Sequence, residues 1–448
     1  MVHQMFYRTA ACAFIGGVLA APAWAAGYGL HEFSTKALGT AFAGGAADGS
    51  DATFQAYNPA AAGAVKNGDV ALAASAILIG SSAHYSTALT SAGTPAGGNA
   101  DPKNFIPSAV APAFGARFKL NDQLSIGLSG FTPWALTTNY AANSAPRYYA
   151  EKTRLVTFDL VPSLAYAITP GITLGVGVQA EYAKGTLSNA VDVGTLAALN
   201  KIPGAKPGQQ DGSAMLSAVN WAVGYSFGAQ AQLSDSLRLG VSYVSSLHHR
   251  FNGQITFQPD AVGLMNVIGA ATGLFKNGPA KAEIDTPDVL RTGASFDLSP
   301  EWTAKAEIDW TGWDNFKTLT VTAANPAQPP DVLAGNWKST WMESIGVDYH
   351  PTGALSWRAG VALDPSPIPD ATLSPRIPDG DRVILGLGAS YKMAGGDELA
   401  FGYSHLFVQS RAVAQTPAMT GNALRGALTG TSNANVNVVS IQFNHSFD

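Results

Sequence analysis

Cysteine, charge and long apolar runs are all scarce in this 448-residue chain, and each scarcity excludes a class of protein. The single cysteine leaves no disulfide framework that could stabilise a small secreted domain. Only 13% of the residues are charged, about half the share of a typical soluble protein. The net charge of −5 comes without a basic cluster, so we predict no nucleic-acid partner. Beyond the N-terminal segment described next, no apolar run reaches the length of a transmembrane helix.

Residues 1–25 have the pattern of a secretory signal peptide. Arg8 is followed by an apolar stretch from Ala10 to Ala21, which Pro22 ends. The small residues of Ala23-Trp24-Ala25 suit a signal peptidase. Cys12 lies inside this segment, so we expect the mature chain to contain no cysteine and no thiol chemistry.

The C-terminal segment alternates between apolar and polar side chains, as a strand with two different faces does. Val439, Ile441 and Phe443 fall on one face, and Ser440, Gln442 and Asn444 fall on the other. In a soluble sheet the apolar face would be the core. In an outer-membrane β-barrel the apolar face points to lipid and the polar face to the lumen.

Similar alternation recurs along the chain, and the connections between these segments are short and long in turn. It is clearest at 124–129, 172–183, 237–243, 302–311, 383–392 and 399–408. We count about fourteen strands, an even number that can close without a free edge. A soluble β-sandwich or propeller has no reason to keep this rhythm. We therefore predict an all-β transmembrane fold, an antiparallel outer-membrane barrel.

Residues 26–67 do not alternate and are rich in small and turn-forming residues. Their low charge and apolar side chains, among them Leu30, Phe33 and Phe54, argue against a solvated tail. They suit a segment that folds inside the lumen.

Several motifs resemble those of the FadL-type long-chain fatty acid transporters of Gram-negative outer membranes, a family that includes uptake channels for aromatic hydrocarbons. The resemblance covers essentially the whole mature chain. It is carried in order by Gly27–Ser34, Asn58-Pro59-Ala60, Leu160–Tyr166, Trp310–Phe316, Arg358–Val361, Asp364–Pro369 and Ile377–Arg382. It implies a signal peptide at 1–25, an N-terminal hatch at 26–67 that plugs the lumen, and a fourteen-stranded transmembrane barrel at 68–448.

The resemblance also implies passive uptake of hydrophobic molecules with lateral release through the barrel wall. Pro133 cannot donate to a β-ladder and belongs at an edge or a bulge. By the resemblance, this segment is the family's kinked third strand, and Pro133, Trp134 and Ala135 are expected to flank the lateral opening. A proline just beyond the membrane zone of an ordinary strand is the alternative. By the same resemblance, Asn58, Pro59 and Ala60 would lie on the hatch facing that opening, with the Asn58 side chain bonded to backbone where the ladder is broken. A plain Asn-Pro turn is the alternative.

Two expected long loops, 188–218 and 259–281, are rich in apolar side chains, which suggests an outer capture site. Packing of the two loops on each other is an alternative that does not exclude capture. The candidate capture residues are Leu196, Val262, Leu264, Met265, Ile268, Leu274 and Phe275.

A fatty acid carboxylate would need a cation inside the lumen. Lys184 and Lys317 are the candidates, but neither falls securely in the lumenal register. This leaves open whether the substrate is a fatty acid or an uncharged aromatic or aliphatic hydrocarbon.

We predict no enzyme activity, cofactor or metal site. An outer-membrane lipid hydrolase would need a serine and a histidine on one face, and the adjacent Ser404 and His405 point to opposite faces. A general hydrophilic porin would need an open lumen ringed by charge. The low charge of the chain and the expected plug argue against that function. We expect a monomer surrounded by outer-membrane lipid and lipopolysaccharide, with detergent in the lumen in a crystal.

Overall fold

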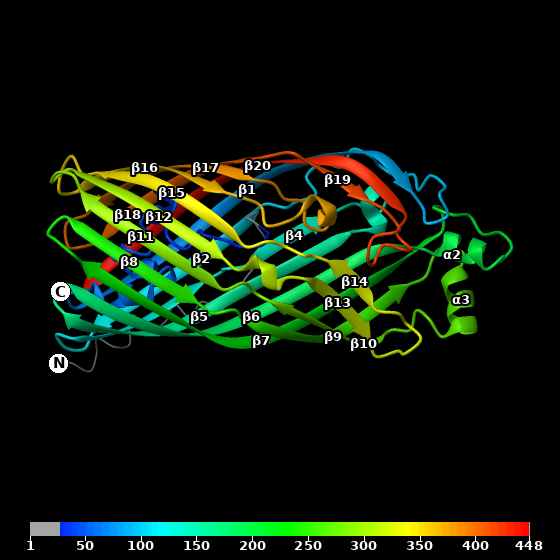
Figure 1. Cartoon of the computed structure of the whole chain (residues 1–448), viewed down its shortest axis with the longest axis horizontal. Helices are drawn as coiled ribbons and strands as arrows, with labels where there is room; N and C mark the ends of the chain where they lie inside the picture. Colours follow the sequence, from blue (N-terminus) through cyan, green and yellow to red (C-terminus); the bar gives the residue numbers. More distant parts are fainter. Residues whose placement is uncertain (1–26, 448) are drawn as a thin grey trace.

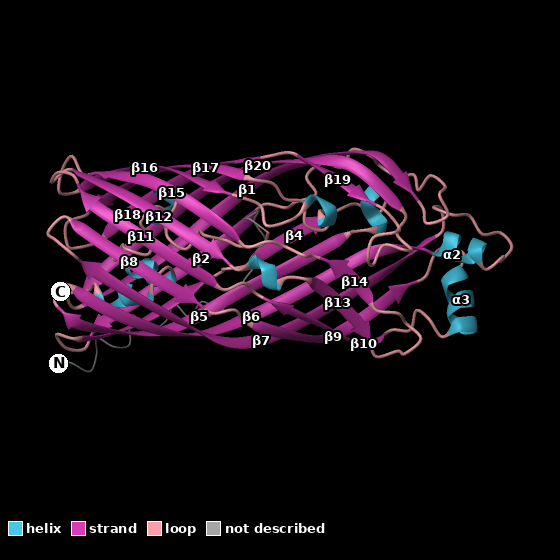
Figure 2. Cartoon of the chain, in the orientation of Figure 1, coloured by secondary structure: helices cyan, strands magenta, loops and turns pink. Residues whose placement is uncertain are grey.

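The computed structural model describes residues 27–447, so the predicted signal peptide lies outside the described residues. All the strands belong to one antiparallel sheet. The sheet is closed, because β1 (Gly68–Leu89) pairs with β2 (Ala109–Lys119) on one side and with β20 (Ala427–Phe447) on the other. Figures 1 and 2 show the resulting cylinder.

Twenty strand segments form fourteen barrel strands, because six of the strands are interrupted. The interrupted strands are β3 (Leu124–Phe131) with β4 (Ala135–Asn139), β8 (Leu237–Val244) with β9 (His248–Gln258), β10 (Gly278–Asp285) with β11 (Val289–Asp297), β12 (Trp302–Thr311) with β13 (Thr318–Ala323), β14 (Asp331–Ala334) with β15 (Thr340–Tyr349), and β18 (Glu398–Val408) with β19 (Arg411–Gln415). The other strands are β5 (Lys152–Thr169), β6 (Ile172–Asp192), β7 (Asp211–Gln232), β16 (Leu355–Asp364) and β17 (Arg382–Lys392).

The helices are few and short. They are α1 (Thr35–Gly39), α2 (Val193–Leu199) and α3 (Leu264–Thr272), with 3-10 turns η1 (Ala52–Ala56), η2 (Pro59–Gly63), η3 (Ala145–Tyr148), η4 (Trp313–Asn315) and η5 (Asp370–Thr372). Within residues 27–447, no helix is both long enough and apolar enough to cross a membrane.

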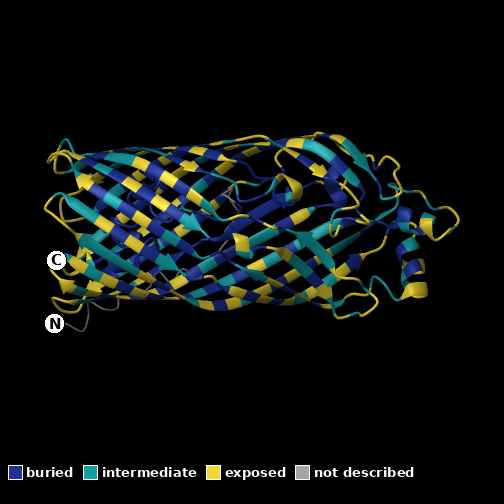
Figure 3. Cartoon of the chain, viewed as in Figure 1, coloured by how far each residue is buried: buried dark blue, intermediate teal, exposed yellow. Residues whose placement is uncertain are grey.

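The apolar face of the sheet points outward. On β20, Val439 and Ile441 are 50% and 47% exposed, whereas Ser440 and Gln442 are 1% exposed. The same alternation of exposed and buried residues runs along the strands around the cylinder (Figure 3). This is the arrangement of a protein whose outer solvent is lipid, and it confirms the predicted outer-membrane barrel.

The two ends of the barrel differ in their connections. Tight turns, such as Pro170-Gly171 between β5 and β6, lie at the end near the C-terminus. The long connections that carry α2 and α3 lie at the opposite end (Figure 1). Short periplasmic turns and long outer loops are the usual asymmetry of outer-membrane barrels.

Residues 27–64 pack inside the half of the barrel that carries the tight turns, at the left in Figure 1, and nearly all of them are buried. Their backbone touches inward-facing glycines of the wall so closely that an added Cβ would lie 2.0–2.2 Å from a backbone atom. We call these four positions the glycine sockets: Gly115 against Ala52, Gly175 against Ala60, Gly240 against Ala46, and Gly360 against Thr40.

Buried ion pairs also join the N-terminal segment to the wall. The Lys36 ammonium lies 2.6 Å from a carboxylate oxygen of Glu398, on β18. In a second pair the lysine belongs to the wall and the carboxylate to the segment. The Lys305 ammonium, on β12, lies 2.7 Å from Asp48 of the segment and 2.8 Å from Asp348, on β15. The segment is therefore fixed to several strands of the barrel.

Candidate functional site

The third strand of the barrel is broken at Thr132-Pro133-Trp134, between β3 and β4. Three residues separate Phe131 from Ala135, whereas their partners Asp159 and Val156 on β5 are separated by only two. This mismatch is a bulge, and Pro133, which has no N–H to donate, lies at its centre.

The break also separates β4 from β2. The ladder between β2 and β3 ends at Phe114 and Gly130. Beyond it, residues 109–113 of β2 pair with β1 alone among the described residues. All of residues 131–138 are buried, although alternate residues of a regular wall strand would face outward. The third strand therefore turns into the lumen at the break.

The start of the N-terminal segment pairs with the backbone of the broken third strand at the break. Gly29 forms an antiparallel bridge with Trp134. The Leu30 N–H donates to the Pro133 carbonyl at 2.7 Å, and the Ala135 N–H donates to the Tyr28 carbonyl at 2.8 Å. These bonds satisfy backbone groups that the interrupted ladder cannot satisfy.

Aromatic side chains surround Tyr28, which directly precedes the bridging residue Gly29. The Tyr28 ring centre lies 4.7 Å from that of Trp313, 5.5 Å from that of Trp337 and 5.8 Å from that of Trp134. Phe316 completes the group at 6.2 Å. This aromatic cluster is 1–7% exposed. We call it the partition, because its members line both of the pockets described next.

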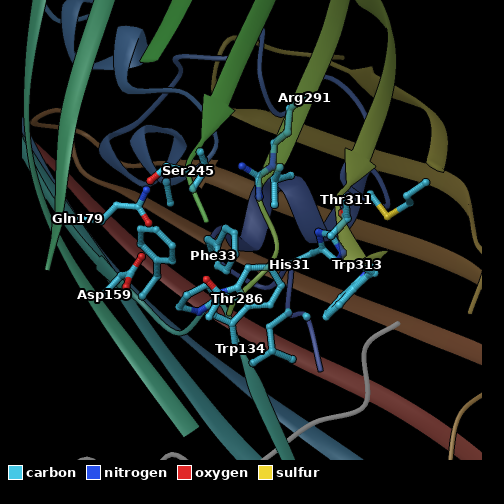
Figure 4. Close-up of a pocket in the computed structure, with 18 of the residues that line it drawn as sticks. His31, Phe33, Trp134, Asp159, Gln179, Ser245, Thr286, Arg291, Thr311 and Trp313 are labelled. Carbon is cyan, nitrogen blue, oxygen red and sulfur yellow. The ribbon is translucent and has the colours of Figure 1, made fainter. Parts of the chain in front are cut away.

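A pocket lies below the partition, beside the N-terminal segment; we call it the inner pocket (Figure 4). Several lining residues lie where strands are interrupted, including Trp134, Ser245, Thr286 and Trp313. The lining is mixed. Its apolar side chains are Leu30, Phe33, Phe131, Pro133, Trp134, Trp313 and Met342. Its polar side chains are Asp159, Gln179, Ser245, Thr286, Arg291 and Asp364.

A second, almost wholly apolar space, the middle cavity, lies on the other side of the partition. Its lining includes Tyr28, Leu136, Leu155, Leu187, Leu216, Phe251, Ile284, Phe316 and Ile377. A third space, the outer groove, lies among the long loops. Its lining includes Val191, Leu196, Phe257, Leu274, Phe275, Pro329 and Leu424.

Strand β6 gives the order of the three spaces along the barrel. Residues 189–192 line the outer groove, residues 185–187 line the middle cavity, and Gln179 lines the inner pocket. Gly175, further along β6, touches Ala60 of the N-terminal segment. Because a strand advances about 3.3 Å per residue, the spaces follow one another from the loop end towards the N-terminal segment.

Residues 16–447 match the model of a family described as outer membrane protein transport protein (OMPP1/FadL/TodX). The chain belongs to this family. Its members are outer-membrane transport channels for fatty acids and hydrocarbons and are not enzymes. The chain is accordingly an outer-membrane protein of a Gram-negative bacterium.

Relatives of this FadL/TodX-family chain match it over nearly their full length. It is 25% identical to the long-chain fatty acid transport protein of Escherichia coli K12, over 96% of this chain and 99% of the relative. It is 27% identical to outer membrane protein P1 of Haemophilus influenzae, over 99% of both chains.

Solved structures share the fold. A Pseudomonas aeruginosa FadL homologue superposes with a TM-score of 0.86 at 24% identity, over 94% of this chain and all of that one. The Ralstonia pickettii toluene transporter TbuX gives a TM-score of 0.65 at 18% identity, over 93% of this chain and 98% of that one.

In this family member, Asn58, Pro59 and Ala60 lie on the N-terminal segment, but they contact a different part of the wall from the one expected. The Asn58 amide donates to the carbonyls of Ala46, Ala229 and Val241. Ala229 and Val241 are paired residues of β7 and β8, where the ladder is intact. The expected bond from Asn58 to the broken strand is therefore wrong, and residues 28–30 make that contact instead.

The loop residues divide into two groups. Leu196, Leu274 and Phe275 line the outer groove. Met265 and Ile268, which are 2% and 4% exposed, join α3 to α2 in a small core that Leu264 borders. Val262 is exposed away from the groove. The residues of the first group also pack against this core, so capture and loop packing are both compatible with the structure.

The two lysines considered for carboxylate binding are exposed and line none of the three spaces. Lys184 pairs with Val219, whose side chain is 47% exposed, so both point outward from the wall. The prediction of a carboxylate site at Lys184 or Lys317 gains no support from this placement.

Arg291 was not singled out in the sequence, although it lines the inner pocket. A local signal exists, because Arg291 and Ser295 share the inward register of β11, whereas Leu290, Ala294 and Phe296 share the outward one. Its place opposite the broken strand depends on closure of the barrel, which no local pattern reveals.

Proposed function

We propose that this channel takes up hydrophobic molecules without an energy source, by capture in the outer groove, transfer through the middle cavity and lateral release at the break between β3 and β4. One observation carries the proposal. Three spaces follow one another along β6, two of them with mainly apolar linings and the last with a mixed lining, and they end at an interrupted wall strand.

Lateral release is favoured by the chemistry of the cargo. Each methylene that leaves water for an apolar phase gains about 0.8 kcal/mol. A long alkyl chain therefore has little tendency to enter the aqueous periplasm and a large tendency to enter lipid. The wall break offers that second path, and the N-terminal segment, acting as a hatch, blocks a continuous aqueous path below it.

Uptake by cells that lack other channels of this kind tests the proposal. Radiolabelled oleate and toluene are supplied separately to cells with and without the protein. We expect the protein to raise uptake of at least one of them, and the comparison identifies the cargo class. Failure to raise uptake of either compound would overturn the proposal.

Tyr28 is expected to move during transport, because it separates the middle cavity from the inner pocket. Replacing Tyr28 by alanine removes a ring packed among four others and should weaken docking of the segment by about 3 kcal/mol. We expect a higher ion conductance in planar bilayers and faster proteolysis near the N-terminus. Tyr28→Phe is the control, since it keeps the ring and loses only the 3.4 Å bond to the Asp285 carbonyl. Unchanged conductance in Tyr28→Ala would contradict a partition role.

The outer groove should set the concentration at which uptake is half-maximal. Replacing both Leu274 and Phe275 by serine removes apolar surface from the groove, and we expect the half-maximal concentration to rise about tenfold with little change in maximal rate. Val262→Ser is the matched control, because Val262 lies outside the groove and is 65% exposed. Equal effects of the double and control variants would remove the groove from the route.

We also propose that the barrel works as a monomer with outer-membrane lipid and lipopolysaccharide around it. The outward apolar face supports contact with lipid. In a crystal, the apolar middle cavity is the place where we expect a detergent tail.

A further inference from the structure

The barrel wall has a second interruption, on the strands that carry β10 and β13. Pairing of β10 with β13 ends at Ala282 and Val321, and pairing of β11 with β12 begins at Val289 and Thr311. In the described part of the chain, the two stretches between these pairs form no sheet pairs with each other. The stretch that follows Thr311 is the longer, so the two cannot match residue for residue. The shorter stretch contains Pro287, which has no N–H to donate.

A side chain bridges this gap where a ladder would otherwise run. The Asn315 amide donates to the Thr286 carbonyl at 3.0 Å and to the Ser246 hydroxyl at 3.5 Å. Its Oδ1 atom is buried and has no hydrogen-bond partner among the described residues. At one edge of the gap, the Gly312 N–H donates to the Asp288 carbonyl at 2.9 Å. The bridge across the middle of the gap is therefore a single neutral side chain, which can be released by breaking weak bonds.

The outer surface over this gap is a groove, which we call the side groove. Ala282, Ile284 and Phe316 line both the side groove and the middle cavity. Single residues therefore separate the outer surface of the wall from the middle cavity at this place. The rest of the side groove is mainly polar, and its lining includes His248, Lys281, Glu283, Asp285, Thr318, Thr320 and Thr322.

The side groove lies at the outer edge of the apolar band of the barrel. On β8 the outward residues are apolar, and Leu239 and Val241 are 38% and 43% exposed. On β9, which continues the same strand, the exposed residues are polar, among them His248, Arg250 and Asn252. The long connection that carries α3 joins β9 to β10 at this end of the barrel (Figure 1). The groove therefore opens where the head groups of the outer leaflet meet its acyl chains.

We propose that the gap between β10 and β13 is a side entrance, through which single-chain molecules dissolved in the outer leaflet reach the middle cavity without passing the outer groove. The rim of the entrance carries both signs of charge, with Lys281 and Glu283, which suits a small head without net charge. The apolar cavity behind Ile284 suits an alkyl chain. Because such a chain is far more concentrated in lipid than in water, this entrance draws on the larger pool. The inference rests on the proposed function, since it supplies the same middle cavity.

Reaction of a cysteine inside the middle cavity tests the side entrance on the whole barrel in nanodiscs. Leu216→Cys is the reporter, because Leu216 lines the middle cavity and not the side groove, and residues 27–447 contain no natural cysteine. The reagent is dodecyl maleimide dissolved in the nanodisc lipid, and the mass of the intact protein reports its addition. Pro133 is deleted in the parent and in every variant, to remove the route through the break between β3 and β4.

Two substitutions change the side entrance in opposite directions. Thr320→Trp fills the side groove and should slow the reaction about tenfold. Asn315→Ala removes the bridge and should speed the reaction about fivefold, the size of one neutral hydrogen bond. Thr292→Trp is the matched control and should react at the parent rate, because Thr292 is exposed on β11 and lines none of the spaces described. Replacing Leu274 and Phe275 by serine should also leave the rate unchanged, because the reagent bypasses the outer groove.

The proposal is overturned if Thr320→Trp reacts at the parent rate, if Thr292→Trp slows the reaction as much as Thr320→Trp does, or if the double serine variant is the one that slows it. Heat-modifiable mobility on gels shows that each variant compared is folded. A reporter that stays unmodified even when Pro133 is restored would instead count against the proposed function, because alkyl molecules would then not reach the middle cavity by any route.

Discussion

Deleting Pro133 is expected to close the barrel wall and reduce uptake of long-chain cargo about tenfold or more. The deletion leaves two residues between Phe131 and Ala135, which matches the two residues between Asp159 and Val156 on β5. The ladder can then run without a bulge, and β4 can pair with the free edge of β2. Uptake is measured with labelled cargo in cells that contain equal amounts of folded protein.

The expected loss follows from the path left to the cargo. With the wall closed, release requires the aqueous periplasm, at a cost of about 0.8 kcal/mol for each methylene taken from an apolar site into water. Binding in the outer groove should stay unchanged, because the groove lies at the other end of the barrel. The deletion should therefore lower the maximal rate and not the capture of substrate.

Pro133→Ala is the control for this deletion. It restores a backbone N–H but keeps the mismatch of three residues against two, so most of the uptake should remain. If the deletion variant is folded, as judged by its heat-modifiable mobility on gels, and transports as fast as wild type, release at this break is excluded.

Replacing Lys305 by methionine is expected to have the largest effect on stability. The substitution leaves Asp48 and Asp348 buried without the ammonium that lies within 2.8 Å of both. Removing one partner of a buried ion pair costs about 3–5 kcal/mol. We expect the N-terminal segment to detach at lower denaturant concentrations, measured by its susceptibility to protease.

The pH dependence of this variant should be opposite in sign to that of wild type. Burial alone would raise the pKa of Asp48, but the Lys305 ammonium holds that pKa well below its usual range. In wild type the pair therefore contributes stability above the ordinary pKa of an aspartate and loses it only in strong acid. Without Lys305, burial raises the pKa, so docking should improve as the pH falls from 7.5 to 5.

Lys392→Met is the matched control, because Lys392 is exposed on the barrel wall. Its stability and its pH dependence should follow wild type. Equal docking of the segment in Lys305→Met and Lys392→Met at pH 7.5 would show that the buried ion pairs do not hold it.

The parts of the fold that depend on local patterns could be predicted from the sequence. Alternation has a period of two residues and needs no knowledge of distant partners, so the two faces of β20 follow from residues 439–447 themselves. Which face is outward followed from the composition and the loop pattern of the whole chain. Pro133 was a candidate for a broken strand because a proline removes a ladder hydrogen bond. The resemblance was needed to choose it, because Pro112 and Pro162 lie inside the continuous strands β2 and β5.

The remaining errors come from long-range register. Lys184 has the right charge for a carboxylate, but its pairing with Val219 turns it outward. Asn58 has the right donors for a broken ladder, yet the fold of the segment carries it to β7 and β8. Arg291 and Trp134 line the same pocket only because the sheet closes. No local pattern in the sequence indicates that they lie in one site.

The glycine sockets imply that the two parts of this protein cannot diverge independently. A methyl group at Gly115, Gly175, Gly240 or Gly360 would collide with the backbone of the buried segment, whatever the side chains there. Such a change does not alter the lipid-facing surface, so the damage would appear as a displaced hatch in an otherwise intact cylinder. Chimeras that exchange the first 67 residues between relatives should therefore be chosen by the fit of main chain to main chain.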